Sequence, residues 1–164
     1  MTSREVPTGV VCDDRPAVRR AISSLLTRCG FLVLGETTHF RDLRGLVVQA
    51  VPTVAVVTLP VAGMNGLTDV SSLRRAAPRT ELVLVSAFGT LDGAARDAGA
   101  LALVPEDDPQ ALQAVLLGLS RQWHASMTAL PAARCYCEPS RDIAASSLVT
   151  CATSSGSSST KPPS

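Results

Sequence analysis

The sequence predicts an α/β fold, a five-stranded parallel sheet with helices on both faces. Short apolar, β-branched runs alternate five times with segments whose apolar residues recur at helical spacing. The third run, TVAVVT at residues 53–58, is almost wholly apolar and β-branched, which is typical of a strand covered on both faces. Right-handed crossovers between parallel strands place helices on both faces. We therefore expect one doubly wound domain.

The first two strand–helix units have clear boundary signals. Residues 9–12 form a short apolar run that ends in two acids. Pro16 suits the first turn of the next helix, and Gly30 suits the position just past its end. Residues 31–36 (FLVLGE) predict the second strand, and the second helix stops before Pro52.

The last three units repeat this pattern. A helix over residues 67–77 follows the buried third strand. The runs ELVLVS (81–86) and LALV (101–104) predict the fourth and fifth strands, with a short helix of small residues between them. Asp108 followed by Pro109 is typical of an N-cap and a first helical residue, so a fifth helix begins there.

Composition separates this domain, expected over residues 8–122, from an N-terminal extension over 1–7 and a tail over 123–164. The tail ends in a Ser/Pro/Gly-rich stretch that lacks the apolar surface needed to order it. The net charge of +1 gives no electrostatic case for direct nucleic acid binding. No apolar run reaches the roughly 18–20 residues that span a bilayer, so we expect a cytoplasmic protein without membrane contact.

Polar residues gather where the predicted strands end, which is where parallel α/β sheets carry their sites. Asp13 and Asp14 follow the first strand, Thr58 ends the third, Ser86 ends the fourth, and Glu106 follows the fifth. Four stretches that contain or adjoin these residues resemble the receiver domain of response regulators: VVCDDRPAVRRAISSLL, PTVAVVTLPVAGMNGL, LRRAAPRTELVLVSAFG and DAGALALV.

The resemblance covers residues 8–119 and is greatest to receivers that carry a LuxR-type DNA-binding output. It implies a flavodoxin-like fold and a place in two-component, phosphorelay signal transduction. In the family, two acids after the first strand hold Mg²⁺, and Asp13 and Asp14 match them. A Ser or Thr ending the fourth strand reads the phosphoryl group, and Ser86 matches this switch position.

Two positions depart from the family. Thr58 stands where the phospho-accepting aspartate is expected, and the lysine that pairs with phosphate is replaced by Val104, Pro105 or Glu106, of which we assign Glu106 to the position. Phosphoryl transfer needs an ionised oxygen and a cation, whereas threonine is neutral and the single lysine of the chain is Lys161. We therefore expect no catalytic residue and no enzyme.

Without a third carboxylate, Asp13 and Asp14 should bind Mg²⁺ weakly, if at all, and no other cofactor is expected. Adjacent carboxylates without a nearby cation should raise each other's pKa. Alternatives stay open: the two acids cap the first helix, Ser86 bonds to the backbone, Thr58 is a plain strand terminus, and Glu106 joins the two acids in one acidic cluster.

The leading hypothesis is an atypical pseudo-receiver that binds a partner protein or a second copy without aspartyl phosphorylation. The resemblance implies an interaction face on the fourth helix, fifth strand and fifth helix. Its candidate residues, some of which must belong to the core, are Leu91, Ala95, Leu103, Leu112 and Leu116. The alternative is a partner, or truncated form, of a LuxR-type DNA-binding regulator of transcription.

Overall fold

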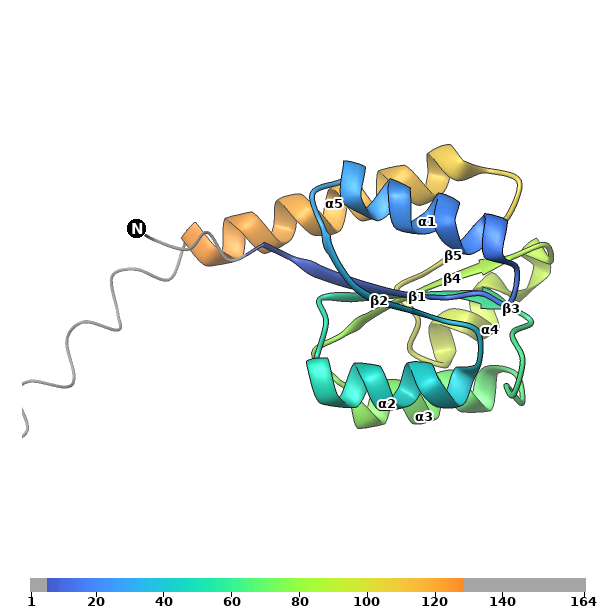
Figure 1. Cartoon of the computed structure of the whole chain (residues 1–164). Helices are drawn as coiled ribbons and strands as arrows, with labels where there is room; N and C mark the ends of the chain where they lie inside the picture. The colour runs from blue at the N-terminus through green and yellow to red at the C-terminus, as the bar shows by residue number, and fades with distance from the viewer. Residues whose placement is uncertain (1–5, 129–164) are drawn as a thin grey trace, which may run out of the picture. The chain divides into compact units, whose positions relative to one another are not determined.

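Five parallel strands form one sheet in the computed structural model, which describes residues 6–128 (Figure 1). The strands are β1 (Thr8–Cys12), β2 (Leu32–Thr37), β3 (Val54–Leu59), β4 (Glu81–Ser86) and β5 (Ala102–Pro105). The helices are α1 (Pro16–Arg28), α2 (Phe40–Ala50), α3 (Leu67–Ala76), α4 (Asp92–Asp97) and α5 (Pro109–Thr128), with a 3₁₀ turn, η1 (Gly89–Leu91), before α4. The strand order β2-β1-β3-β4-β5 confirms the predicted doubly wound sheet.

The boundary signals of α1 act as expected. Pro16 occupies its first turn, where the missing N–H needs no partner. Gly30 lies just beyond the C-cap residue Cys29 with φ +91°, a left-handed conformation that glycine adopts without steric cost. The sequence therefore sets both ends of this helix, and the start of α1 fixes the loop that follows β1.

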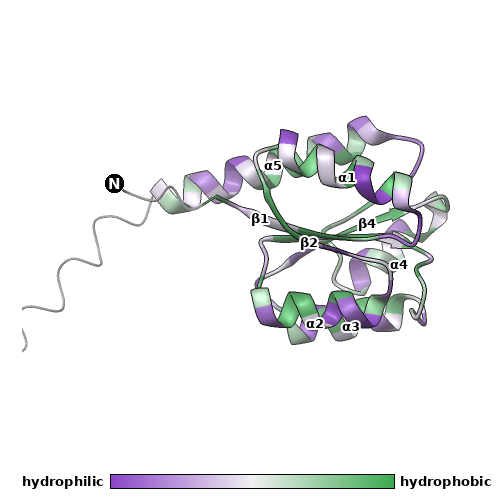
Figure 2. Cartoon of the chain, in the orientation of Figure 1, coloured by the Kyte–Doolittle hydropathy of each residue, from purple (hydrophilic) through white to green (hydrophobic). Residues whose placement is uncertain are grey.

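Each face of the sheet has its own core. Helices α2, α3 and α4 cover one face, and α1 and α5 cover the other (Figure 1). Successive β3 residues alternate between the two cores, because Val57 belongs to one cluster and Val56 to the other. All of β3 is buried, which confirms the two-sided burial predicted from its sequence. Figure 2 shows the central strands as hydrophobic between helices that also carry hydrophilic segments.

Helix α5 is longer than the sequence analysis predicts. It continues to Thr128, so residues 123–128, assigned to the tail, are helical. The prediction followed the apolar periodicity, which stops at Leu119, whereas residues such as Gln122, Ala125 and Met127 favour a helix without apolar spacing. The rest of the expected tail, residues 129–164, lies outside the described residues. No helix in the described part of the chain has the length and hydropathy of a membrane span.

Threonine hydroxyls at the amino ends of the strands, one of them buried and two partly buried, have backbone partners. The amide N–H of Thr8 donates to Thr53 Oγ1 at 3.1 Å, and the amide of Thr53 donates to Thr8 Oγ1 at 3.2 Å. The Thr80 hydroxyl donates to the carbonyl oxygen of Pro52 at 2.8 Å. Threonines at this edge of the sheet therefore connect neighbouring segments of the chain.

Three of the five residues named for the interaction face belong to the core, as the sequence analysis expects for some of them. Ala95, Leu112 and Leu116 are buried in the two cores, because these side chains are on the inner faces of α4 and α5. Leu91 is partly exposed, and Leu103 is half-buried against the core. Helical spacing identifies an apolar stripe, but it does not tell whether that stripe faces the sheet or a partner.

We expect Leu116→Ala to lower the free energy of unfolding by about 2–5 kcal/mol, because it opens a cavity in the core under α5. Leu101→Ala removes an exposed side chain and should change that free energy by less than about 0.5 kcal/mol. Urea denaturation followed by circular dichroism measures both. A small, equal effect for the two variants would contradict the burial of Leu116.

Candidate functional site

The carboxyl ends of β1, β3, β4 and β5 bring the predicted site residues to one edge of the sheet. Strands β1 and β3 are neighbours in the centre, and the chain leaves them in opposite directions across the sheet. This is the topological switch point, where loops diverge and leave room for a site. Asp13 follows β1 here, and Thr58 lies next to the end of β3.

The carboxylate of Asp13 has no solvent exposure, and Arg15 donates hydrogen bonds to both of its oxygens. The amide N–H of Arg15 donates to Asp13 Oδ1 at 2.7 Å, Nε donates to the same oxygen at 3.3 Å, and Nη2 donates to Oδ2 at 3.2 Å. Arg19, one turn further along α1, donates to the Asp13 carbonyl oxygen at 2.8 Å. Both carboxylate oxygens of Asp13 are thus bound by the chain itself.

The same arginine reaches the loop after β5. Nη1 of Arg15 forms an ion pair and hydrogen bond with Glu106 Oε1. Glu106 is held in place by its amide N–H, which donates to the Ser86 carbonyl oxygen at 3.0 Å. We call Asp13, Arg15 and Glu106 the guanidinium clamp, because one side chain joins the first and last loops of this edge.

The charges of the guanidinium clamp stabilise one another. Burial alone would raise the pKa of Asp13, but the nearby Thr58 hydroxyl and the hydrogen bonds from Arg15 outweigh it and hold that pKa below its ordinary value. Hydrogen bonds with Glu106 and Asp13 raise the pKa of Arg15. The expectation that adjacent carboxylates raise each other's pKa is therefore wrong for Asp13, because a cation lies against it.

Thr58 is only 3% exposed, and its Oγ1 has no hydrogen-bond partner. The hydroxyl is near enough to Asp13 to stabilise the carboxylate, yet the contact lacks hydrogen-bond geometry. A buried hydroxyl without a partner costs about 1–3 kcal/mol in general. Thr58 thus fits the interpretation of a strand residue kept for its shape.

Ser86 ends β4 beside Leu59 and Pro105. Its Oγ accepts a hydrogen bond from the Phe88 amide N–H at 3.0 Å. This is the backbone-bonded arrangement that the sequence left open as the alternative to a switch residue. The helix-capping alternative for the two acids is not seen, because the N-cap of α1 is Arg15 and no side chain caps that helix.

The residues present do not fit a Mg²⁺ site. Arg15 occupies both oxygens of Asp13, while Asp14 is exposed and its Oδ1 lies 3.9 Å from Arg15 Nε. Within residues 6–128, no three His, Cys, Asp or Glu side chains are grouped to hold a metal ion. Glu106 does lie near Asp13, as the acidic-cluster alternative requires, but the group between them is a guanidinium.

Sequence reasoning missed Arg15, the residue on which this geometry depends. A signal was present, because the motif CDDRP places an arginine directly after the two acids. Glu106, which the sequence analysis assigns to the lysine position of the family, follows β5 directly. An acid at the family's lysine position and an arginine after β1 together indicate that the positive charge has changed its place in the site. The two residues, Arg15 and Glu106, are 91 positions apart in the chain, so the sequence alone does not connect them.

Comparisons with known proteins agree with this architecture. The family model of the response regulator receiver domain matches residues 10–117. The chemotaxis protein CheY of Thermotoga maritima is 22% identical over 80 residues, which cover 49% of this chain and 67% of CheY.

Two solved structures share the fold. The signal receiver domain of the response regulator NarL from Mycobacterium tuberculosis has a TM-score of 0.62 at 22% identity, covering 73% of this chain and 96% of that one. A two-component response regulator of the LuxR family from Aurantimonas sp. SI85-9A1 has a TM-score of 0.61 at 22% identity, covering 70% and 87%. The sheet order, the site at its carboxyl edge and the family match agree, and the chain belongs to the response regulator receiver family.

Proposed function

We propose that this protein is a pseudo-receiver, a signalling module of the cytoplasm that acts by protein–protein contact without aspartyl phosphorylation. The observation that carries this proposal is the guanidinium clamp, in which Arg15 binds both oxygens of Asp13 and also Glu106. The clamp lies at the end of the sheet where receivers of this family carry their phosphorylation site.

The clamp competes directly with a metal ion. A divalent cation bound to Asp13 would have to displace a guanidinium that makes two hydrogen bonds to that carboxylate, to which the amide N–H of Arg15 adds a third. Charge-assisted bonds of this kind are the strong ones, and a displaced Arg15 would also lose Glu106. We therefore propose that Mg²⁺ does not bind this edge of the sheet at ordinary concentrations.

The nucleophile is missing as well. The hydroxyl of Thr58 is un-ionised at neutral pH and needs a base to attack phosphorus. The nearest carboxylate is Asp13, whose pKa is held below its ordinary value, so it has little tendency to take up a proton. The residues beside Thr58 therefore favour a structural role over phosphoryl transfer.

Without a phosphoryl group, nothing in this site biases an equilibrium between two states. We propose that the protein stays in one arrangement and binds a partner, or a second copy, through exposed apolar residues near α4 and β5. Leu91 is 36% exposed at the end of η1, and Leu101 is exposed just before β5. This surface replaces the predicted face that included Ala95, Leu112 and Leu116.

A second candidate function is a partner, or a shortened form, of a LuxR-type DNA-binding regulator of transcription. The structural similarity to a LuxR-family response regulator favours it. In that case the pseudo-receiver would regulate an output domain that belongs to another segment or chain. A gel shift at low salt with this protein alone should show no retardation of DNA, because its net charge is +1.

Incubation with acetyl phosphate and Mg²⁺ should leave the intact mass of the protein unchanged, because the acceptor aspartate and the phosphate-pairing lysine are both absent. Thr58→Asp alone should also remain unmodified, since Arg15 still occupies the metal position. The combined variant Arg15→Ala, Thr58→Asp, Glu106→Lys restores the family pattern and is the comparison that should gain a phosphoryl group. A phosphoryl group on the natural protein would contradict the proposal.

Arg15→Ala should lower the free energy of unfolding by about 1–3 kcal/mol, because it leaves the Asp13 carboxylate buried without its partner. The loss is smaller than for a fully buried pair, since the Arg15 side chain is 46% exposed. Arg20→Ala, an exposed change on the same helix, is the control and should cost under about 0.5 kcal/mol. Added Mg²⁺ should raise the melting temperature of Arg15→Ala more than that of the natural protein.

Stability should fall in acid because the pKa of Asp13 is lower in the folded state than in the unfolded state. Its contribution is complete above the unfolded value of about 3.9 and disappears as pH falls through the lower folded value. Urea denaturation between neutral pH and about pH 3 should therefore show a shallower decline for Asp13→Asn than for the natural protein. Parallel profiles for the two proteins would show that the clamp does not stabilise the carboxylate.

A further inference from the structure

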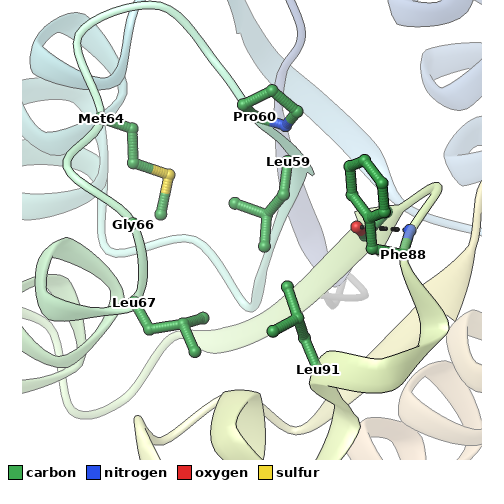
Figure 3. Close-up of a pocket in the computed structure, with 8 residues that line it drawn as sticks. Leu59, Pro60, Met64, Gly66, Leu67, Phe88 and Leu91 are labelled. Atoms are coloured by element: carbon green, nitrogen blue, oxygen red, sulfur yellow. Dashed lines mark hydrogen bonds between the residues drawn. The ribbon is translucent and has the colours of Figure 1, made fainter.

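A pocket of about 210 Å³ lies beside the carboxyl end of β3, on the side of the sheet that α3 and α4 cover. Its walls come from the end of β3, the loop that leads to α3, and the segment between β4 and α4. Figure 3 shows the aliphatic and aromatic side chains around one space. They are Leu59, Pro60, Met64, Leu67, Phe88 and Leu91.

One polar side chain, Ser86, lines this pocket. Its Oγ accepts the amide N–H of Phe88, shown as a dashed line in Figure 3. Ser86 is only 1% exposed, and its hydroxyl donates to no group within residues 6–128, so a ligand must reach the floor of the pocket to accept this proton. The pocket therefore offers an apolar wall and a single hydrogen-bond donor, the usual composition of a site for a small organic molecule.

The size of the pocket limits the ligand to a single ring. An engineered apolar cavity of about 150 Å³ holds benzene, so this pocket has room for a benzene ring with a short substituent. Phe88 is 62% exposed, so part of its ring is open to solvent. An aromatic ligand would cover part of that ring, and Met64 can adapt its side chain to the ligand's shape.

We propose that this pocket binds a small, uncharged aromatic carbonyl compound, with the ring among the leucines and the carbonyl oxygen accepting the Ser86 proton. None of the three residues of the guanidinium clamp lines the pocket, so the proposed binding uses no contact with the clamp. The ligand would hold together the β3–α3 and β4–α4 segments. The binding itself does not rest on the proposed function. Only its consequence does, namely that a ligand between these two segments would regulate how the pseudo-receiver binds its partner.

Acetophenone is the probe, titrated into the ¹⁵N-labelled full chain and followed by amide chemical shifts. Shifts should concentrate at residues 59–67 and 86–91. Ethylbenzene, which has nearly the same shape without the carbonyl, should bind about 3–10-fold more weakly, because it lacks the hydrogen bond from Ser86. Ser86→Ala should bind the two compounds about equally.

Two filling variants and one control test the location. Leu91→Trp and Met64→Trp place a larger side chain at the pocket and should each weaken acetophenone binding at least tenfold. Leu32→Trp makes the same kind of change on the exposed edge strand β2 and should leave the affinity unchanged. Amide spectra of each variant report whether it is folded.

Absence of saturable shifts at millimolar acetophenone would overturn the proposal. So would shifts spread over the surface, or unchanged affinity in both filled variants. The outcome is separate from that of the phosphorylation experiment. A natural protein that accepts a phosphoryl group would overturn the pseudo-receiver and leave the pocket intact, whereas a failed titration would remove the ligand and leave the pseudo-receiver.

Discussion

The contact between Arg15 and Asp13 is the constraint on which the rest of this site depends. Asp13 is fully buried at the end of a central strand, and an ionised carboxylate there needs a counter-charge to offset the loss of water. In a phosphorylatable receiver that charge is a metal ion, which can come and go. Here it is a side chain two residues along, so the charge balance is permanent. Under the proposed function, the guanidinium thus takes the place of a metal ion that binds and dissociates.

Much of the fold could be predicted because its signals are local. The buried run of β3 and the proline and glycine at the ends of α1 identify their elements from a few adjacent residues. The end of α5 and the burial of Leu116 could not be read in this way. Helix propensity extends a helix past its apolar stripe, and a stripe alone does not name the surface it meets.

The site was harder to predict because one of the two contacts of Arg15, the one with Glu106, is not local. Asp13, Thr58, Ser86 and Glu106 were found because strand ends of a parallel sheet meet at one edge. Arg15 was not, since its role depends on Glu106, which lies 91 residues away in the chain. An acid at a position where a family has a lysine is a useful signal in such cases. It directs attention to arginines elsewhere in the site that could supply the missing positive charge.

Thr58 differs from the threonines at the opposite edge of the sheet, which bond to the backbone of neighbouring segments. Its Oγ1 makes no hydrogen bond, yet the hydroxyl helps to lower the pKa of Asp13. Valine at residue 58 would therefore keep the shape of the side chain and lose this effect on Asp13. Residues 13, 15 and 106, in contrast, are coupled, because a single substitution leaves an opposite charge without its partner. Among close relatives of this chain, residue 58 would vary alone while the three residues of the clamp co-vary.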